Sequence, residues 1–315
     1  MCIPIFQFAV LFILFMIDYM IESKYSVSGS RLFDAVAICT GRYDTPHFPT
    51  ISGLDAYTGK YEHSKDYASP EFYEGKHVLI VGAHASGTDL LIDLCEHGVR
   101  ADISHRSPEP KLGLPSGVVQ YNEPILFDGD TVYFKGDAEG HKFDVIIFAT
   151  GYDTNLQYLD PECLLETDVL PRPLYKFLVN PKYPTMAVFN QCCFIAPFPF
   201  CEYQALYFRK ILLGELKLES YEDLLSEAWT LTKRKPDLHL KYQYGLHLDQ
   251  FEYNKELAGL CGILLELEND MDALSNLYDR VGRYRAAGPA TYRNKEYELD
   301  EGSGMFKMTK DWNLL

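Results

Sequence analysis

The sequence predicts an α/β fold, and two parts of the chain carry that prediction. From residue 77 an apolar run, HVLIV, is followed by a glycine turn, GAHASG, then by an amphipathic helix, TDLLIDLCEHG, and a second apolar run, VRADISHR. Strand, turn, helix and strand over about thirty residues form one βαβ unit with parallel strands. After Ser220, helical patterns such as YEDLLSEAWTLTK and DALSNLYDRVGRY predict C-terminal helices.

Composition narrows the class of protein. The 315 residues allow one large or two modest domains. A net charge of −16, with no cluster of lysine and arginine to offset it, would repel phosphate backbones, so we expect no nucleic-acid partner. The eight cysteines show neither a CxxC pair nor the Cys/His spacing of a zinc site. We therefore expect reduced cysteines that pack in the core, no metal site and no dithiol chemistry.

The first seventeen residues, MCIPIFQFAVLFILFMI, are almost entirely apolar and fit three interpretations. A secretory signal would have a basic start and a small-residue cleavage site, and neither is evident. Membrane association through residues 3–17 is the second interpretation, although a spanning helix needs about twenty apolar residues. The third, which we favour, is that the segment is foreign to the fold, as translated intron or a misplaced start. Location in the cytoplasm or at the endoplasmic reticulum membrane therefore stays open.

The stretches before the βαβ unit differ in regularity. The apolar run Phe33 to Cys39 predicts a buried strand that ends in a turn at Thr40 and Gly41. Residues 50–73 are polar, aromatic and punctuated by glycine, so we expect a connecting loop with little regular structure.

Further strands and one helix are expected after the βαβ unit. Residues 107–142 are rich in proline, glycine and aspartate with brief alternating runs, which predicts a hairpin or meander. FDVIIFATGY, apolar from Phe143 to Ala149, is the next strand, and TMAVFNQC is a further candidate. An aromatic loop, CCFIAPFPFCEY, then leads to a helix from Gln204 to Leu213.

The glycine turn carries the chemistry of a Rossmann-like dinucleotide site. Such a turn needs a tight bend, a close approach of the backbone to pyrophosphate and a helix N-terminus directed at the negative charge. Gly82 and Gly87 fill the first and third glycine positions, but His84 occupies the second. If this imidazole crowds the phosphates, replacing His84 with glycine should tighten NADP binding.

The end of the second strand indicates which nucleotide is bound. An NAD site prefers an acidic residue at that tip, whereas a 2′-phosphate prefers arginine and small hydroxyl donors. Here the tip contains Ser104, His105 and Arg106, and Asp102 lies inside the strand. The tip favours NADP; the alternative is that Arg106 is a solvated surface charge.

Taken together, these pieces resemble the flavin-containing monooxygenases. The identifying motif of that family is FxGxxxHxxxY, and the sequence has YTGKYEHSKDY, with Tyr57 replacing the phenylalanine and Gly59, His63 and Tyr67 in register. Four more landmarks follow in order: GKHVLIVGAHASGTD, ISHR, FATGY at residues 148–152 and EYQALYFRKILLGE. The landmarks of the resemblance span residues 33 to 215.

The resemblance implies a cofactor set and a domain plan. The family uses FAD and NADPH to oxygenate soft nitrogen or sulfur nucleophiles, so the implied partners are a small-molecule amine or sulfide and O2. The NADP-binding domain, residues 69–147, would be inserted into a partial FAD-binding domain of residues 23–68 and 148–215. A hydrophobic segment, residues 1–22, would precede them, and a C-terminal helical region, residues 216–315, would follow.

The resemblance also implies site residues, but no catalytic residue. Gly82, Ser86 and Gly87 would hold the pyrophosphate, and Ser104 and Arg106 would lie at the 2′-phosphate. His63 would belong to the linker between the two domains, or be an ordinary loop histidine. Four residues would lie where strands meet the cofactor region, unless they are plain strand-ending turns, and Gln204 would lie on a helix that lines the flavin or on the surface. The four are Thr40, Gly41, Thr150 and Gly151.

One part of the family pattern has no counterpart in the sequence. No glycine-rich turn occurs in residues 1–32, where the family places the FAD-binding GxGxxG. The asparagine that the family places near the reactive carbon of the flavin is also without a match. Two hypotheses follow: a monooxygenase, or a non-catalytic variant that keeps an NADP-binding or partner-binding module. The sequence indicates neither the substrate nor the oligomeric state.

Overall fold

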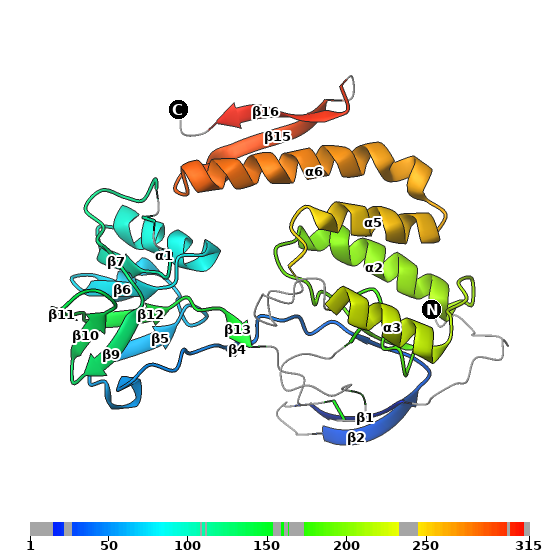
Figure 1. Ribbon diagram of the computed structural model, residues 1–315, viewed down its shortest axis with the longest axis horizontal. Helices are drawn as coiled ribbons and strands as arrows, with labels where there is room; N and C mark the ends of the chain where they lie inside the picture. The colour runs from blue at the N-terminus through cyan, green and yellow to red at the C-terminus, as the bar shows by residue number, and fades with distance from the viewer. Residues whose placement is uncertain are drawn as a thin grey trace. The chain divides into compact units, whose positions relative to one another are not determined.

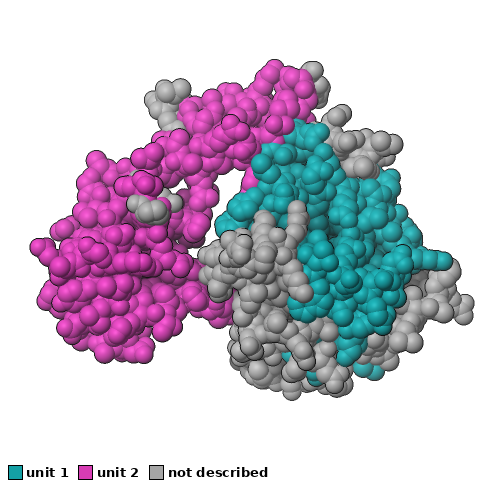
Figure 2. Space-filling view, in the orientation of Figure 1, with its two compact units in different colours: residues 1–42, 154–275 teal, residues 43–153, 276–315 magenta. Residues whose placement is uncertain are grey.

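A computed structural model describes most of the chain, as two compact units (Figures 1 and 2). Unit 1 comprises residues 1–42 and 154–275, and unit 2 comprises residues 43–153 and 276–315. Unit 2 is larger than the expected domain of residues 69–147. It begins already at Tyr43 and includes the chain from Asn276 onward. The described residues are 15–21, 27–107, 109–110, 112–153, 159–160, 163, 173–232, 245–300 and 303–311.

A five-stranded parallel sheet organises unit 2, with the strand order β5-β12-β6-β7-β8. The central strands are short apolar runs that are buried on both faces, as is usual for parallel sheets. Because β12 pairs with β6, the chain that follows FDVIIF emerges beside the glycine turn. The strands are β5 (Lys60–His63), β12 (Val145–Phe148), β6 (His77–Val81), β7 (Arg100–Ser104) and β8 (Gln120–Tyr121).

Each face of this sheet has its own cover (Figure 1). Val78 and Ile80 pack with Leu91 and Leu94 of helix α1 (Ala85–Glu96), as the amphipathic pattern predicts. The alternate residues, such as Leu79, pack against an antiparallel meander. The meander expected within residues 107–142 is confirmed, and consists of β9 (Pro124–Asp128), β10 (Thr131–Phe134) and β11 (Gly140–Lys142).

The expectation of an irregular loop over residues 50–73 is wrong. This stretch contains the edge strand β5 and two short 3-10 helices, η1 (Leu54–Ala56) and η2 (Pro70–Tyr73). Within β5, the sequence KYEH buries only His63 fully, so it has no apolar run. Residues 60–63 form a strand because they pair with β12, and the sequence pattern does not predict this pairing.

Unit 1 combines short strands with helices. Strand β3 (Val36–Ile38) pairs in parallel with β14 (Met186–Val188), and β1 (Phe15–Ile21) pairs antiparallel with β2 (Val27–Phe33). The helices are α2 (Pro197–Leu212), α3 (Tyr221–Thr232), α5 (Asp249–Leu260) and the first half of α6 (Leu264–Ala287), and α2 packs against α5. Among the described residues, no helix is both long and apolar enough to cross a membrane.

Three expectations for these regions need correction. The sequence predicts a buried strand from Phe33 to Cys39, but β3 is only three residues long. Phe33 and Cys39 themselves are exposed. Helix α2 begins at Pro197 rather than Gln204, because proline at the start of a helix loses no hydrogen bond. The expected helical region 216–315 also contains a β-hairpin, β15 (Lys295–Asp300) and β16 (Met305–Asp311), after a 3-10 turn, η4 (Tyr292–Asn294). Residues 1–14, which include most of the hydrophobic segment, lie outside the described residues.

Candidate functional site

The turn between β6 and α1 needs glycine at both positions that the sequence singled out. Gly82 has φ +112°, and a Cβ there would lie 2.4 Å from the carbonyl oxygen of Ala149. A Cβ on Gly87 would lie 1.8 Å from the carbonyl oxygen of Gly82. Both distances are far below a van der Waals contact. The two glycines therefore let the turn pack onto the start of α1 and onto the chain that follows β12.

The second glycine position of the motif does not need glycine here. His84 has an extended backbone, with φ −83° and ψ −166°, and its side chain is exposed. The first bond of the helix runs from Thr88 N–H to His84 O, at 3.0 Å. The amides of Ala85, Ser86 and Gly87 thus precede the helical ladder, and no side chain caps them. Backbone donors at a helix N-terminus fit the pyrophosphate of a dinucleotide.

The sheet brings several expected residues to one edge. Because β5, β12, β6 and β7 are parallel, their carboxyl ends lie together. His63, Gly82 and Ser104 are at or directly after three of these ends, and Thr150 follows the fourth. Ligands of open parallel sheets bind outside the carboxyl ends of the strands. This edge of unit 2 is therefore the candidate site.

Of the two residues expected at a 2′-phosphate, one is available to a ligand. Ser104 is fully buried, and its hydroxyl donates to the carbonyl oxygen of Asn122 at 2.6 Å. This geometry argues against a phosphate contact, because the side chain at the end of β7 points into the protein. Arg106 is exposed and makes no hydrogen bond or ion pair with the described residues. A role of Arg106 at a 2′-phosphate stays a prediction.

His63 joins two strand ends rather than standing in an open linker. Its Nδ1 accepts the backbone N–H of Lys65 at 3.1 Å, so Nε2 carries the proton and donates to the carbonyl oxygen of Gly151 at 2.9 Å. Burial lowers the pKa of His63, and the hydrogen bond to Gly151 only partly opposes this shift. The ring is therefore held neutral, in one tautomer, beneath the FATGY segment.

The other residues of YTGKYEHSKDY also make contacts within unit 2. The hydroxyl of Tyr57 donates to Phe143 O at 3.3 Å, just before β12. A Cβ on Gly59 would lie 2.5 Å from the Tyr57 ring, so the ring covers the glycine. The hydroxyl of Tyr67 donates to Asp93 of α1 at 2.6 Å. The motif thus fastens the edge strand β5 to β12 and to α1.

The family of the chain follows from this motif together with a match to known proteins. Residues 20–112 and 115–271 match the family described as flavin-binding monooxygenase-like. The chain belongs to this family. It is 28% identical over 303 residues to flavin-containing monooxygenase FMO GS-OX-like 4 of Arabidopsis thaliana, which covers 93% of this chain and 65% of that protein. It is 25% identical over 279 residues to trimethylamine monooxygenase of Pelagibacter sp. (strain HTCC7211), with 85% and 60% covered.

Solved structures share the fold. The crystal structure of Tmm from Pelagibacter sp. strain HTCC7211 superposes with a TM-score of 0.80 at 23% identity, over 95% of this chain and 67% of that one. S-allyl-L-cysteine S-oxygenase from Allium sativum gives 0.73 at 27% identity, over 88% and 63%. The predicted α/β class, with a parallel sheet and C-terminal helices, is thereby confirmed. The chain spans about 65% of the length of the first curated relative.

The remaining expected residues of this family member belong to unit 1 or have other partners within unit 2. Thr40 is exposed, and Gly41 has φ +75° with open space around it. The Thr150 hydroxyl donates to the carbonyl oxygen of His47, and the Gly151 carbonyl accepts the N–H of His47 as well as that of His63. These two residues are thus bound into unit 2 as a strand-ending turn.

Gln204 is neither a surface residue nor open to a ligand. Its side chain is fully buried in unit 1, where Oε1 accepts the N–H of Asn190 at 3.2 Å and Nε2 donates to the hydroxyl of Tyr253 at 3.0 Å. That hydroxyl donates to the carbonyl oxygen of Lys176 at 2.8 Å. Both amide atoms of Gln204 are therefore engaged within the core.

The described residues fit one of the two cofactors of the family. The part of the chain that the structure describes contains a single unit of strand, glycine turn and helix, at residues 77–96. This unit fits a dinucleotide, because added Cβ atoms would fill the turn. Thr40, Gly41 and Gln204 form no second cradle of that kind, so the described residues do not fit the pyrophosphate of FAD. The described residues also contain no cluster that could hold a metal ion.

Sequence reasoning assigned no role to Asp102, which the structure shows as a buried carboxylate with two hydrogen-bond donors. Asp102 is almost fully buried inside β7, where Oδ2 accepts from His77 Nε2 at 2.7 Å and Oδ1 from the N–H of Val119 at 2.8 Å. The sequence signal for such a buried, paired carboxylate was an acidic residue inside an apolar strand. Its partners direct Asp102 away from the ligand edge, so it does not act as the acidic residue of an NAD site.

Proposed function

We propose that this chain carries the NADPH-binding part of a flavin-dependent monooxygenase that oxygenates a soft nitrogen or sulfur nucleophile. The observation that supports it best is the packing of the turn, where Gly82 and Gly87 leave no room for a side chain and the first amides of α1 have no side-chain cap. Relatives named for trimethylamine and for S-allyl-L-cysteine support a small-molecule amine or sulfide, with O2, as the substrates.

The choice of NADPH over NADH depends on the charge at the end of β7. Arg106 is exposed there, and a guanidinium pairs well with a phosphate dianion. The nearest acidic residue of the strand, Asp102, is buried and paired with His77. At this strand end Arg106 therefore offers a cation, whereas the carboxylate of Asp102 is engaged inside the protein.

In this proposal FAD would supply the oxygen chemistry, although the described residues of the chain offer no second cradle for its pyrophosphate. The residues of this chain would bind the pyrophosphate of NADPH with the amides of Ala85, Ser86 and Gly87 and select its 2′-phosphate with Arg106. A second function, a nucleotide-binding module without catalysis, is favoured by one observation: the described residues contain one dinucleotide cradle, not two.

A binding titration followed by an activity assay tests both functions on residues 1–315. We expect NADPH to bind about ten-fold or more tightly than NADH, as one charge-assisted contact predicts. Yellow flavin absorbance, with NADPH oxidation that trimethylamine or a thioether stimulates, supports the monooxygenase. A colourless protein that binds NADPH but stays inactive with added FAD supports the nucleotide module. A protein that binds no NADPH overturns both.

A further inference from the structure

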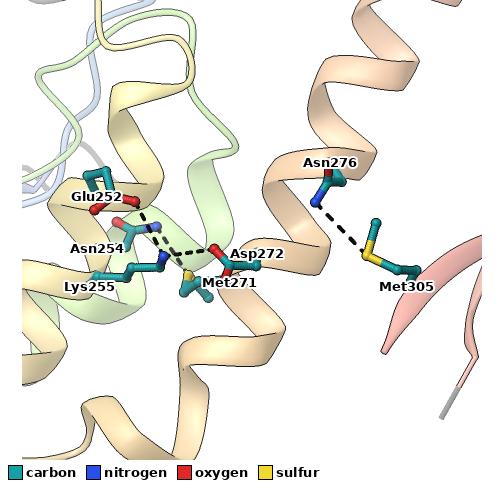
Figure 3. A network of polar contacts seen from close by, with 7 residues as sticks. All are labelled: Glu252, Asn254, Lys255, Met271, Asp272, Asn276 and Met305. Atoms are coloured by element: carbon teal, nitrogen blue, oxygen red, sulfur yellow. Dashed lines mark hydrogen bonds and ion pairs between the residues drawn. The ribbon is translucent and has the colours of Figure 1, made fainter. Parts of the chain in front are cut away.

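The C-terminal segment of unit 2, residues 276–311, is fastened to itself before it reaches the nucleotide fold. Its hairpin lies along the second half of α6 (Figure 1). The amide of Asn276 donates to Met305 Sδ of β16 at 4.0 Å (Figure 3), and the Arg280 guanidinium donates to the carbonyl oxygen of Phe306. Residues 287–293 form the short connection between α6 and the hairpin. These contacts hold together the two elements that the connection joins.

This connection contacts helix α1, which begins at the glycine turn, and the loop that follows β7. Arg293 Nη2 lies 2.5 Å from Asp89 Oδ2 of α1, and its guanidinium lies 5.1 Å from the centre of the Tyr292 ring. Gly113 lies in the loop after β7. A Cβ on it would lie 2.9 Å from Ala287 O and 2.9 Å from Cδ of Pro289. The connection thus touches the helix that begins at the turn and the loop that follows the 2′-phosphate strand.

Asp89 is an unfavourable neighbour for a phosphate. It is the fifth residue of α1, so its Cα is about 6 Å along the axis from that of Ala85. Helical side chains lean toward the N-terminus, which carries the carboxylate back over the first turn. This charge stabilises the empty helix end, but it repels a bound pyrophosphate across less than about one Debye length. The carboxylate is one-third exposed, so solvent screens it only in part.

We propose that Arg293 is a positioning residue for the nucleotide, which acts by neutralising Asp89 beside the pyrophosphate. The C-terminal connection therefore completes the nucleotide site of unit 2, although it lies beyond residue 271, where the match to the family ends. The inference rests on the proposed function, since it requires a dinucleotide at the turn. Its ligand chemistry is the pyrophosphate, so it applies to NADPH and to NADH.

Titration of NADPH binding in four variants of the full chain tests the inference. Arg293→Gln should weaken NADPH binding about three- to ten-fold, because Asp89 then faces the pyrophosphate alone. Asp89→Asn in the same chain should restore the affinity to within about two-fold, and Arg293→Lys should largely retain it. The effect of Arg293→Gln should shrink in about 1 M salt. Arg283→Gln is the matched control, since it removes an exposed arginine of α6 whose partner is Asp279.

Each contrary result has a distinct meaning. If Arg293→Gln binds NADPH as Arg283→Gln does, the inference is overturned. If Asp89→Asn fails to restore the affinity, the loss comes from a disturbed fold and the inference is also overturned. A wild-type chain that binds no nucleotide overturns the proposed function and the inference with it. Melting curves of the variants, recorded without nucleotide, separate folding from binding.

Discussion

His63 Nε2 lies 2.9 Å from the carbonyl oxygen of Gly151, which ties the end of β5 to the segment after β12. We expect His63→Ala to lower the free energy of unfolding by about 1–3 kcal/mol, because it removes one of the two donors to this carbonyl and leaves the N–H of Lys65 without its acceptor. Urea unfolding at pH 7.5 measures the change. A variant as stable as the wild type would show that His63 is an ordinary loop histidine.

The same histidine should make stability depend on pH. Burial lowers the pKa of His63 in the folded state, so the unfolded chain takes up the proton more readily. The contribution to stability is complete above the unfolded pKa of about 6.5 and is lost as pH falls through the lowered folded value. The stability difference between wild type and His63→Ala should therefore shrink from pH 7.5 to pH 5. A difference that is constant over this range would contradict the prediction.

Two glycines of unit 2 should respond to alanine in opposite directions. Gly87→Ala places a Cβ against Gly82 O and should lower the free energy of unfolding by about 2 kcal/mol or more, with loss of NADPH binding. Gly282→Ala meets nothing within 4 Å in the interior of α6 and should raise the free energy by about 0.5–1 kcal/mol. Denaturation curves test both. A neutral Gly87→Ala would rule out the close packing of the turn.

Arg106 and Ser104 should separate nucleotide choice from stability. Arg106→Gln should reduce the preference for NADPH over NADH about ten-fold, since the 2′-phosphate loses its cation. Ser104→Ala should leave that preference unchanged to within about two-fold and lower the free energy of unfolding by about 1 kcal/mol, because Asn122 O loses its donor. Parallel titrations with the two nucleotides decide. A changed preference in Ser104→Ala would restore the sequence-based role of this serine.

Gln204 and Tyr253 should be energetically coupled in unit 1. Gln204→Leu strands the N–H of Asn190, and Tyr253→Phe strands Nε2 of the glutamine, so each should cost about 1–3 kcal/mol. The double variant should lose less than the sum of the two, with a coupling of about 0.5–3 kcal/mol. The free energies of unfolding of the wild type, the two single variants and the double variant give this coupling as a double-mutant cycle. Full stability of Gln204→Leu with lost flavin absorbance would instead place Gln204 at the cofactor.

Local pattern predicted the elements whose formation depends on nearby residues. The βαβ unit from His77 to Ser104 follows from two apolar runs and an amphipathic helix, and the glycines of its turn are needed for close packing within the unit and against Ala149. Strand β5 escaped prediction because its single fully buried side chain, His63, is polar. The joining of residues 276–315 to unit 2 also escaped, because the Arg293–Asp89 pair spans about two hundred positions of sequence.

The sequence by itself determined the family, the α/β class and the position of the glycine turn, since these depend on short motifs with fixed spacing. Tertiary structure alone decided what the motif residues touch. It buried Ser104 and Gln204, left Arg106 exposed, joined His63 to Gly151 and placed Arg293 beside α1. The physical reason is that burial and hydrogen-bond partners depend on which distant segments pack together, and spacing along the chain carries no record of that packing.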